Sequence, residues 1–545
     1  MLNWEELLKE EKLNRLEYQA VKAAGANRDN QKMAYLAVHF LQSGDTVIPI
    51  KKNELIGEFP HLSDWIGNEQ SGKPIIKIND NFVQINRIYH QETYLKSFVV
   101  NNGNVGDNQK ILDADLQFIL GLYKHEYQED SPQIQAVISA IQQNQLLLTG
   151  GPGTGKTFTI VRMLAGLFQI AGLQKEEVVL AAPTGKAAAR MSESIRDSLK
   201  ELAVSDALKD QFPNEGQTIH RLLGISDNAF SARYNQKNPL PFKVIVIDEA
   251  SMIDINLMYT LFQAIKSDTK LILAGDPNQL PSVEAGNVLS DFCELAKRED
   301  SLIKQVHLTF SHRFKDDGGI GRLAKAVNEG NSKEAFRCLN ADDSTQFIEM
   351  KSEKEFQKLI YGELREQLEL MKNATSPKEA FQIFKKKKIL TALRVGRFGS
   401  EGIHKFIQNS YDANHISFKN GFPIMIKKND YQLQVFNSDV GIILNNDEGS
   451  LRVYFENGSD EFRDMNPYTL SNIEPAYAMT VHKSQGSEFD EVVLILPETK
   501  DTDFVSRKLI YTAITRAKKK FTLIGSEKAF KDAIGNDNKR LSGMI

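Results

Sequence analysis

Eight consecutive residues have the types and spacing of a phosphate-binding loop. They are Gly150, Gly151, Pro152, Gly153, Thr154, Gly155, Lys156 and Thr157, and they match G-x-x-x-x-G-K-[ST] in full. An apolar run precedes them at 146–148, and apolar residues at helical spacing follow from 160 to 167. This context predicts that backbone N–H groups and the helix N-terminus hold phosphate, with Lys156 at the β- and γ-phosphates and Thr157 on Mg²⁺. A structural glycine turn is the alternative.

A pair of carboxylates, Asp248 and Glu249, directly follows a second apolar run at 244–247. Neighbouring side chains in a strand point to opposite faces, but the turn at the strand's end allows both to serve one site. We expect Asp248 in the magnesium shell and Glu249 to orient and deprotonate the attacking water. A solvated acidic turn is the alternative. Two carboxylates beside a phosphate site indicate hydrolysis.

A hydrolase also needs groups that sense the γ-phosphate and neutralise charge in the transition state. Gln279, in the segment 275–280 after a further apolar run, has an amide suited to sensing. Arginines suited to the second task are Arg313 and Arg516. If Arg516 is an arginine finger, it comes from a second unit across a cleft, and nucleotide state then controls closure between the units.

The polar motifs all follow short apolar runs, and this spacing predicts the elements that position them. Runs at 146–148, 178–182, 243–247 and 271–274 alternate with helical patterns. Short buried strands alternating with helices predict a parallel sheet whose ligand site lies at the strands' carboxyl ends. Runs at 492–496 and 521–524 predict a second such unit. The predicted fold class is α/β.

The chain divides into three predicted domains. Residues 1–110 form a mainly helical N-terminal domain, with helical spacing at 35–41, an alternating stretch at 82–89 and a turn-rich linker at 101–108. Residues 111–328 and 329–545 form the two α/β units. Short runs with turns at about 415–475 predict a small β-barrel-like insertion in the second unit.

Composition excludes several classes of protein. The 545 residues carry a net charge of only -4, so any nucleic-acid surface must be local. Two cysteines, Cys293 and Cys338, rule out a disulfide framework. No apolar run approaches the roughly 18 residues of a membrane span, and the charged start of the chain does not fit a signal peptide. We therefore expect no membrane partner and a cytoplasmic location.

The order and residue sequences of these motifs resemble those of a superfamily 1 DNA helicase of the RecD type. The resemblance rests on Gly150–Thr157, Ala182–Arg190, Thr218–Gly224, Ile247–Asp254, Gly275–Leu280, Ala478–Phe489 and Tyr511–Lys518. Together these motifs span about 133 to 520, and the match extends weakly to 47–50 and 82–94. It implies two RecA-like P-loop NTPase domains that bind ATP with Mg²⁺ between them.

The resemblance also implies roles for single residues. Gln133 would read the adenine, Gln279 would sense the γ-phosphate, Arg313 and Arg516 would act as fingers, and Gly486 and Glu488 would line the nucleotide cleft. The positions that would touch single-stranded DNA are Pro183, Thr184, His220, Thr480 and His482. Hydroxyls and N–H groups that grip phosphates, and rings that lie on bases, suit binding without sequence preference.

By the same resemblance the chain is an ATP-dependent DNA helicase that moves 5′ to 3′, acting in double-strand break repair as a subunit of RecBCD, exodeoxyribonuclease V. Its partners would be single- and double-stranded DNA and RecB-like and RecC-like subunits of a heterotrimer, with the nuclease on a partner. Stand-alone RecD-like helicases carry a much longer N-terminal extension, which favours the complex subunit. A nucleotide-gated scaffold and a stand-alone helicase are the alternatives.

Four segments leave two interpretations open. Residues 1–110 are a docking surface for a RecC-like subunit or a buttress for the chain's own motor. Lys385–Lys388 grips a DNA backbone or is a solvated charge run. Glu498 and Lys500, with Asp490, Asp501 and Asp503 nearby, suggest a metal nuclease or a polar loop between motor motifs. The segment Ser226–Pro241, with Phe230 and Tyr234, is a strand-separating wedge or a surface loop.

Overall fold

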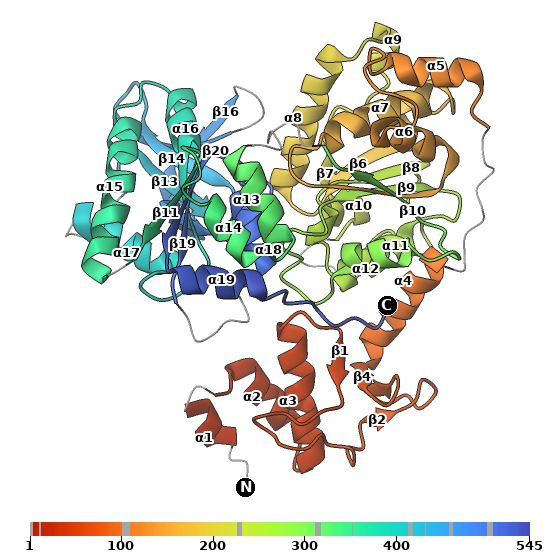
Figure 1. The fold of residues 1–545 in the computed structure, drawn as a ribbon, viewed down its shortest axis with the longest axis vertical. Coiled ribbons are helices and arrows are strands. Elements are labelled where there is room, and N and C mark those ends of the chain that lie inside the picture. The colour runs from red at the N-terminus through yellow and green to blue at the C-terminus, as the bar shows by residue number, and fades with distance from the viewer. Residues whose placement is uncertain are drawn as a thin grey trace.

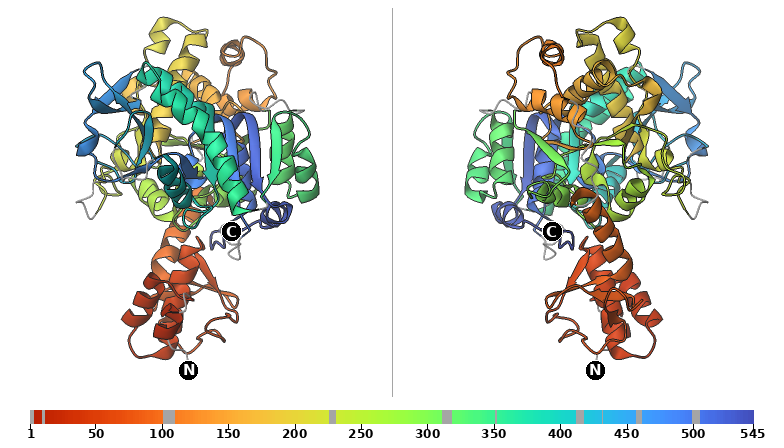
Figure 2. Two further views of the ribbon diagram at one scale, coloured as in Figure 1. Left: turned by 90° about the vertical axis from the view of Figure 1, so that its left-hand side faces the viewer. Right: turned by 90° about the vertical axis from the view of Figure 1, so that its right-hand side faces the viewer.

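The computed structural model describes residues 4–9, 12–100, 110–225, 231–310, 318–350, 352–411, 418–430, 432–456, 461–498 and 505–545. Two α/β units lie side by side, and a smaller lobe formed by the N-terminal residues projects from them (Figure 1). The N-terminal lobe stands equally clear of the rest in both side views (Figure 2). The chain therefore has two large units and one separate extension.

The N-terminal lobe combines helices with a small sheet. Its helices are α1 (Trp4–Lys9), α2 (Arg15–Ala23) and α3 (Arg28–Gln42). Its sheet has the order β1-β4-β3-β2, formed by β1 (Val47–Pro49), β2 (Ile66–Gly67), β3 (Ile75–Lys77) and β4 (Phe82–Ile85). Met33 and Leu36 of α3 pack with Ile75 and Val83 of the sheet in one apolar core.

The alternating stretch at 82–89 is only half strand. β4 ends at Ile85, and α4 (Asn86–Val100) begins at the next residue. Ile88, Leu95 and Val99 are buried and recur at helical spacing. Residues 86–89 of the alternating stretch are helical, because four residues are too few to separate the two periods.

Helix α4 connects the N-terminal lobe to the first large unit (Figure 1). Its buried side chains Ile88, Leu95 and Val99 share a core with Leu147 and Ile245 of the large sheet. The helix packs beside α11 (Ile255–Ala264) and α12 (Val288–Leu295). Residues 86–100 therefore contribute to the core of the first unit.

The first unit, or first motor, is built on a six-stranded parallel sheet in the order β10-β5-β9-β8-β6-β7. The strands are β5 (Gln145–Gly150), β6 (Val178–Ala182), β7 (Gln217–Thr218), β8 (Val244–Ile247), β9 (Lys270–Gly275) and β10 (Lys304–Leu308). One face packs on α5 (Asp113–Gly121), α6 (Pro132–Gln142), α7 (Lys156–Gln169) and α8 (Gly185–Glu201). The other packs on α4, α10 (Ile219–Leu223), α11 and α12.

The second unit, or second motor, is built on a five-stranded parallel sheet in the order β11-β20-β19-β12-β18. The strands are β11 (Thr345–Glu349), β12 (Lys387–Thr391), β18 (Ala478–Thr480), β19 (Phe489–Leu496) and β20 (Ala517–Gly525). Its helices are α13 (Gly319–Asn328), α14 (Ser332–Cys338), α15 (Glu353–Lys372), α16 (Pro377–Lys386), α17 (Ser400–Tyr411), α18 (Arg507–Ile514) and α19 (Glu527–Gly535).

Between β12 and β18 lies an antiparallel sheet in the order β16-β15-β14-β13-β17. Its strands are β13 (Phe422–Ile426), β14 (Val440–Asn445), β15 (Leu451–Glu456), β16 (Phe462–Met465) and β17 (Ile473–Pro475). Ile424, Ile443 and Phe455 belong to a small core of its own. The predicted α/β fold, with two parallel sheets and a β-rich insertion, is confirmed.

The segment after α19 leaves the second motor and crosses to the other two units. Arg540 donates to the carbonyl oxygens of Ser282, Glu284 and Gly286 in the first motor, at 2.8, 2.9 and 2.7 Å. The carbonyl oxygen of Leu541 accepts from the backbone N–H of Thr46 in the N-terminal lobe at 2.9 Å. This segment, residues 536–545, is called the C-terminal strap below. Within the described residues, no helix has the length and apolar character needed to span a membrane.

Candidate active site

The phosphate-binding loop joins β5 to α7 at the carboxyl edge of the first sheet. Gly153 and Gly155 have φ values of 77° and 82°, which glycine adopts without strain. A Cβ atom at Gly150 would lie 2.6 Å from Thr154 Oγ1 and 2.9 Å from the Leu308 carbonyl oxygen. α7 begins without a side-chain cap, so its first N–H groups face the loop as anion donors.

Lys156, the first residue of α7, folds back over this loop. Its Nζ atom donates to the carbonyl oxygens of Gly150 and Gly151 at 2.8 and 3.2 Å. Both bonds are made within six residues of chain. The ammonium group is therefore held at the loop by the loop's own backbone.

The two predicted carboxylates stand at the end of the buried strand β8. Glu249 has a φ of 54°, a left-handed value that is uncommon outside glycine and recurs at functional sites. Its N–H donates to Asp248 Oδ1 at 2.8 Å. This turn ends at Glu249 the alternation of side chains between the two faces of β8. Burial raises the pKa of Asp248, Glu249 raises it further, and Lys156 opposes the shift, so the three charges share one site.

Gln279 lies in the loop that follows β9, and β9 runs between β5 and β8 in the sheet. The side chain of Gln279 is 4% exposed. Its Nε2 donates to Asp276 Oδ2 at 3.3 Å, and burial raises the pKa of Asp276. The loop therefore reaches the cleft between the phosphate-binding loop and the two carboxylates.

Arg516 of the second motor lies against this loop. The arginine is 2% exposed, and its NH2 donates to Gln279 Oε1 at 2.9 Å. Its other nitrogens donate to the carbonyl oxygens of Thr512 and Ser487 at 3.3 and 3.2 Å. Burial lowers its pKa, and Glu249 is the first of the charges that oppose this shift. The structure thus joins two predicted site residues that lie far apart in the sequence.

Three further side chains of the second motor grip the same loop. Tyr511 Oη donates to Asp276 Oδ2 at 3.1 Å, and Thr512 Oγ1 accepts from the Leu280 N–H at 2.9 Å. Gln485 Nε2 donates to the Leu280 carbonyl oxygen at 2.8 Å. Sequence reasoning recognised both motifs that carry these residues but gave roles only to their neighbours. These three side chains are polar and lie within recognised motifs, and that is the signal in the sequence that could have identified them.

Gly486 and Glu488, predicted to line the nucleotide cleft, face Arg190 of the first motor. Arg190 NH1 donates to the Gly486 carbonyl oxygen at 3.2 Å, and Arg190 NH2 forms an ion pair with Glu488. Lys518 approaches the other oxygen of Glu488 at 3.5 Å. Arg190 ends the motif Ala182–Arg190, but no role was predicted for it.

Gln133, the predicted adenine contact, is buried near the start of α6. Tyr123 Oη donates to the Gln133 carbonyl oxygen at 3.2 Å. The buried guanidinium of Arg162 lies 3.1 Å above the centre of the Phe158 ring and donates to the Leu122 carbonyl oxygen at 3.1 Å. Phe158 directly follows Thr157, so these contacts fix α6 relative to the phosphate-binding loop.

The two predicted magnesium ligands both offer oxygen atoms. Thr157 supplies a hydroxyl in the first turn of α7, and Asp248 supplies a carboxylate on the strand two places away in the sheet. No cluster of three or more His, Cys, Asp or Glu that could hold a metal occurs among the described residues. Two oxygen donors leave the other positions to phosphate and water, which is how Mg²⁺ binds at nucleotide sites. The donor set fits Mg²⁺ held together with a triphosphate.

The predicted DNA-contacting residues fall into two groups at sheet edges. Pro183 and Thr184 follow β6, and His220 follows β7, which pairs with β6 through Ala182 and Thr218. These residues therefore meet on the first motor. Thr184 caps α8 by accepting from the Ala187 N–H at 3.2 Å, while the ring of His220 is exposed.

The second group lies on the second motor. Thr480 ends the edge strand β18, and its Oγ1 accepts from the Lys483 N–H at 3.4 Å. His482 is half-buried, in the short helix η4 (His482–Ser484). Burial and the charge of Arg540 lower the pKa of His482. Its ring is therefore neutral near pH 7 and offers a flat face rather than a charge.

Comparisons with known proteins agree with this geometry. Residues 133–285 match the family model described as an AAA domain, and residues 475–524 match the UvrD-like helicase C-terminal domain. The chain is 36% identical over 482 residues to the RecBCD enzyme subunit RecD of Haemophilus influenzae, covering 77% of this chain and 73% of the relative. It is 35% identical over 531 residues to the protein of the same name in Mycolicibacterium smegmatis, covering 93% and 92%.

The chain belongs to the RecD family. It is accordingly an ATP-dependent helicase with two RecA-like motors. The ATP-dependent RecD2 DNA helicase of Deinococcus radiodurans is 29% identical over 395 residues, which cover 71% of this chain and 48% of that relative. The RecD-type chain described here therefore spans about half of the RecD2 protein and nearly all of the M. smegmatis subunit.

Several predicted residues of this RecD-type chain lie outside the described residues. They are Arg313, Phe230, Lys500, Asp501 and Asp503. Tyr234 packs on the core of the first motor, which favours a surface loop for its part of Ser226–Pro241. Glu498 is exposed and accepts from Ser526 Oγ at 2.8 Å.

The lysine run Lys385–Lys388 is solvated only in part, since Lys385 and Lys386 are exposed while Lys388 is buried. Lys385 pairs with Glu456 at 2.5 Å and Lys387 with Glu363 at 2.7 Å. Lys388 is 2% exposed and donates to a backbone carbonyl oxygen. Both interpretations of Lys388 are wrong, because the run crosses from α16 into the buried strand β12.

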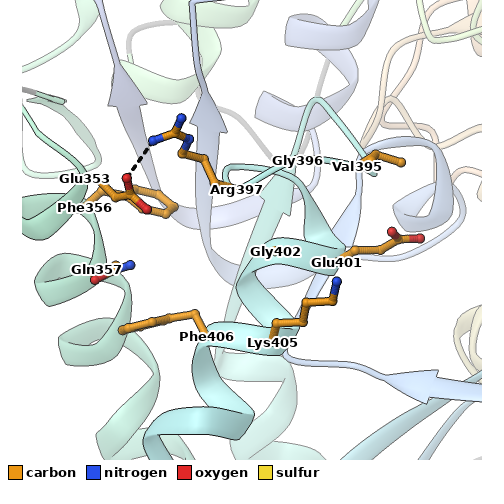
Figure 3. Close-up of a pocket in the computed structure, with 10 residues that line it drawn as sticks. All are labelled: Glu353, Phe356, Gln357, Val395, Gly396, Arg397, Glu401, Gly402, Lys405 and Phe406. Atoms are coloured by element: carbon orange, nitrogen blue, oxygen red, sulfur yellow. Dashed lines mark hydrogen bonds and ion pairs between the residues drawn. The ribbon is translucent and has the colours of Figure 1, made fainter. Parts of the chain in front are cut away.

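A cavity of about 310 Å³ lies in the second motor between α15 and α17 (Figure 3). It is lined by Glu353, Phe356, Gln357, Val395, Gly396, Arg397, Glu401, Gly402, Lys405 and Phe406. Arg397 pairs with Glu353 at 2.6 Å and Arg394 with Glu401 at 3.0 Å. Its acidic groups are thus each matched by an arginine. The cavity shares no residue with the predicted site.

Proposed function

We propose that this chain is the 5′-to-3′ single-stranded-DNA motor of a RecBCD-type helicase–nuclease. The observation that carries the proposal is the hydrogen bond from Arg516 of the second motor to Gln279 of the first. It places a candidate arginine finger and a candidate γ-phosphate sensor in contact across the cleft. Hydrolysis at that point would change the contact between the motors.

In the proposed reaction, the phosphate-binding loop holds the β- and γ-phosphates of ATP, with Lys156 beside them. Glu249 takes a proton from the water whose oxygen attacks the γ-phosphorus, and the bond to the bridging oxygen of ADP breaks. Arg516 and Lys156 balance the charge that develops on the transferring group. Mg²⁺, held through Thr157 and Asp248, would supply charge neutralisation on the phosphates.

Movement along DNA would follow from the two groups of contacts. Pro183, Thr184 and His220 would hold the strand on the first motor, and Thr480 and His482 on the second. Closure on ATP would bring the two grips together, and opening after hydrolysis would separate them. The direction and the choice of DNA rest on membership of the family.

The partner proposal is that RecB-like and RecC-like subunits bind this chain, as the names of its relatives state for those proteins. We assign the docking surface to the N-terminal lobe, the described residues between 4 and 85, which has a core of its own. α4 is left out, because it packs in the core of the first motor. That helix is the buttress, and the lobe before it is the docking surface.

The helicase proposal is tested with forked DNA carrying either a 5′ or a 3′ single-stranded tail. We expect ATPase activity stimulated by single-stranded DNA and strand separation only from the 5′ tail. Binding of unrelated oligonucleotides should weaken with salt and differ little between sequences. ATP binding without stimulation or separation would favour the nucleotide-gated scaffold instead, and a hundredfold preference for one sequence would contradict the proposed DNA contacts.

The partner proposal is tested by deleting residues 1–80 and keeping α4. DNA-stimulated ATPase activity should persist while co-purification with the partner subunits is lost. The isolated full chain should not degrade DNA in the presence of Mg²⁺ and ATP. Retained co-purification would remove the docking role of the lobe. Nuclease activity abolished by Glu498→Gln would overturn the assignment of cleavage to a partner.

A further inference from the structure

One helix of the first motor carries both a candidate DNA contact and a residue of the nucleotide cleft. α8 begins at Gly185, directly after Pro183 and Thr184. Arg190 lies six residues after Thr184, which corresponds to roughly 9 Å along a helix. In Figure 1, α8 lies on the side of the first motor that faces the second.

Arg190 is the point where α8 contacts the second motor. Its guanidinium donates to the Gly486 carbonyl oxygen at 3.2 Å and pairs with Glu488. The side chain of Arg190 is 35% exposed and that of Glu488 is 12% exposed. A partly desolvated arginine–carboxylate pair with an added carbonyl contact is stronger and more directional than an exposed ion pair.

The charges around Arg190 are those of the hydrolytic site. Burial lowers the pKa of Arg190, while Glu249 and Asp248 favour its charged form and Arg516 opposes it. A shift of Arg190 would therefore alter the field at the catalytic carboxylates and at Arg516. It would also change the ion pairing of Glu488, whose other carboxylate oxygen lies near Lys518.

The other end of α8 lies where DNA would bind. Thr184 caps the helix, and a Cβ atom at Gly185 would lie 3.2 Å from the ring of Phe436 in the β-rich insertion. Ala187, Ala188 and Met191 bury one face of the helix. Because that face is packed, α8 transmits a displacement of its first turn as a rigid element.

We propose that Arg190 is the positioning residue that couples single-stranded DNA binding at the start of α8 to the nucleotide site, through its ion pair with Glu488 across the two motors. The inference rests on the proposed DNA-motor function. Coupling between two ligands is reciprocal. Nucleotide must then change DNA affinity by the same factor by which DNA changes nucleotide affinity, and this factor must depend on Arg190.

The test measures the Kd of a fluorescent oligo(dT) strand with and without saturating AMP-PNP, a non-hydrolysable ATP analogue. In the unaltered chain we expect the two Kd values to differ by about tenfold, a usual size for such coupling. In Arg190→Met the ratio of the two Kd values should fall to within about twofold of one, because little coupling then remains. The Kd without nucleotide should change little.

The matched control is Arg196→Met, which removes an exposed arginine from the same helix and should keep the full ratio. Glu488→Gln, measured at saturating AMP-PNP, tests the pair from the other motor and should lose the coupling as well. The double variant should lose no more than either single one, because both remove one interaction. Arg190→Lys should restore part of the ratio, since it keeps the charge without the planar fork.

The proposal is overturned if Arg190→Met keeps the ratio, or if Arg196→Met loses it equally. A chain that binds no AMP-PNP or no oligo(dT) would instead contradict the proposed function. A Glu488→Gln variant that keeps full coupling while Arg190→Met loses it would also reject the proposed pair. The failure of the inference and the failure of the function are thus distinct outcomes.

Discussion

The two halves of the nucleotide cleft are built in different ways. On the first motor the contacts are local: Lys156 bonds to carbonyl oxygens within six residues, and Glu249 bonds to its neighbour. On the second motor Arg516 reaches a residue 237 positions away, and Tyr511 one 235 positions away. The first half therefore exists in a single folded unit, while the second half exists only where the motors meet. The proposed function gives the chemistry to the first half and its control to the second.

The largest effect should come from the local half. Lys156→Ala removes the charge nearest the transferring phosphoryl group, and ATP turnover should fall to background in a steady-state assay. The two bonds from Lys156 go only to carbonyl oxygens of its own loop, so no contact between distant elements is lost and the fold should persist. Near-normal ATPase activity would remove the basis for a hydrolytic first motor.

The next largest effect should come from the other half. Arg516→Ala should lower kcat by about 10³–10⁵, the usual contribution of an arginine finger, with nucleotide affinity changed only several-fold. Arg516→Lys keeps the charge and serves as the comparison. Kd measurements and single-turnover hydrolysis separate the two quantities. Equal losses of affinity and turnover would make Arg516 a ground-state binding residue and erase the contrast between the halves.

A smaller effect is expected at the adenine side. Arg162→Met removes the group that ties α7 to the carbonyl oxygen of Leu122, and this loosens the position of Gln133. KM for ATP should rise about tenfold, as expected for one lost charge-assisted hydrogen bond, and the preference for ATP over GTP should weaken. Tyr123→Phe removes only the Tyr123 hydroxyl and should give a smaller change. If the KM values for ATP and for GTP rise equally, Arg162 contributes to the stability of the fold and does not position Gln133.

The last expected effect concerns stability rather than catalysis. Burial, opposed by a hydrogen bond from Ser542 and aided by the charge of Glu92, raises the pKa of Asp291 to about 7. Because the folded-state pKa lies above the ordinary value of 3.8, the stabilising protonated form is present at low pH and is lost as pH rises toward 7. The free energy of unfolding should fall by at most about 1.4 kcal/mol per pH unit between roughly pH 4 and 7. Asp291→Asn should flatten this slope in thermal melts, and an unchanged slope would exclude Asp291 as its source.

Much of the first half of the cleft was predictable, because each motif follows a strand whose carboxyl end fixes its place. Asp248 and Lys156 needed no long-range information. The start of a helix at residue 86 could not be predicted, because a short alternation suits either period. Arg190 was missed because its partner, Glu488, is 298 residues away. Lys388 was misjudged because a lysine run gives no sign that a buried strand begins within it.

The site residues themselves remain predictions, although the structure brings many of them together. Gln279 and Arg516 meet, as do Pro183 and Thr184 with His220 at one sheet edge. Arg313 cannot be placed, since it lies outside the described residues. The bonds of Tyr511, Thr512 and Gln485 follow from the packing of the two motors, and packing between units is not encoded in local spacing.

The C-terminal strap has a consequence for how the chain folds. Thr46 bonds to Leu541 and Gly44 to Gly286, so the junction of the N-terminal lobe joins residues up to 495 positions apart in the chain. Contacts of such large sequence separation form late, because the loop between them must close first. The lobe can form its own core first, but Asp45 and Glu92 gain their hydrogen bonds from Leu541 and Gly543 only when the strap has closed. The strap then closes after the units that it joins have formed cores of their own.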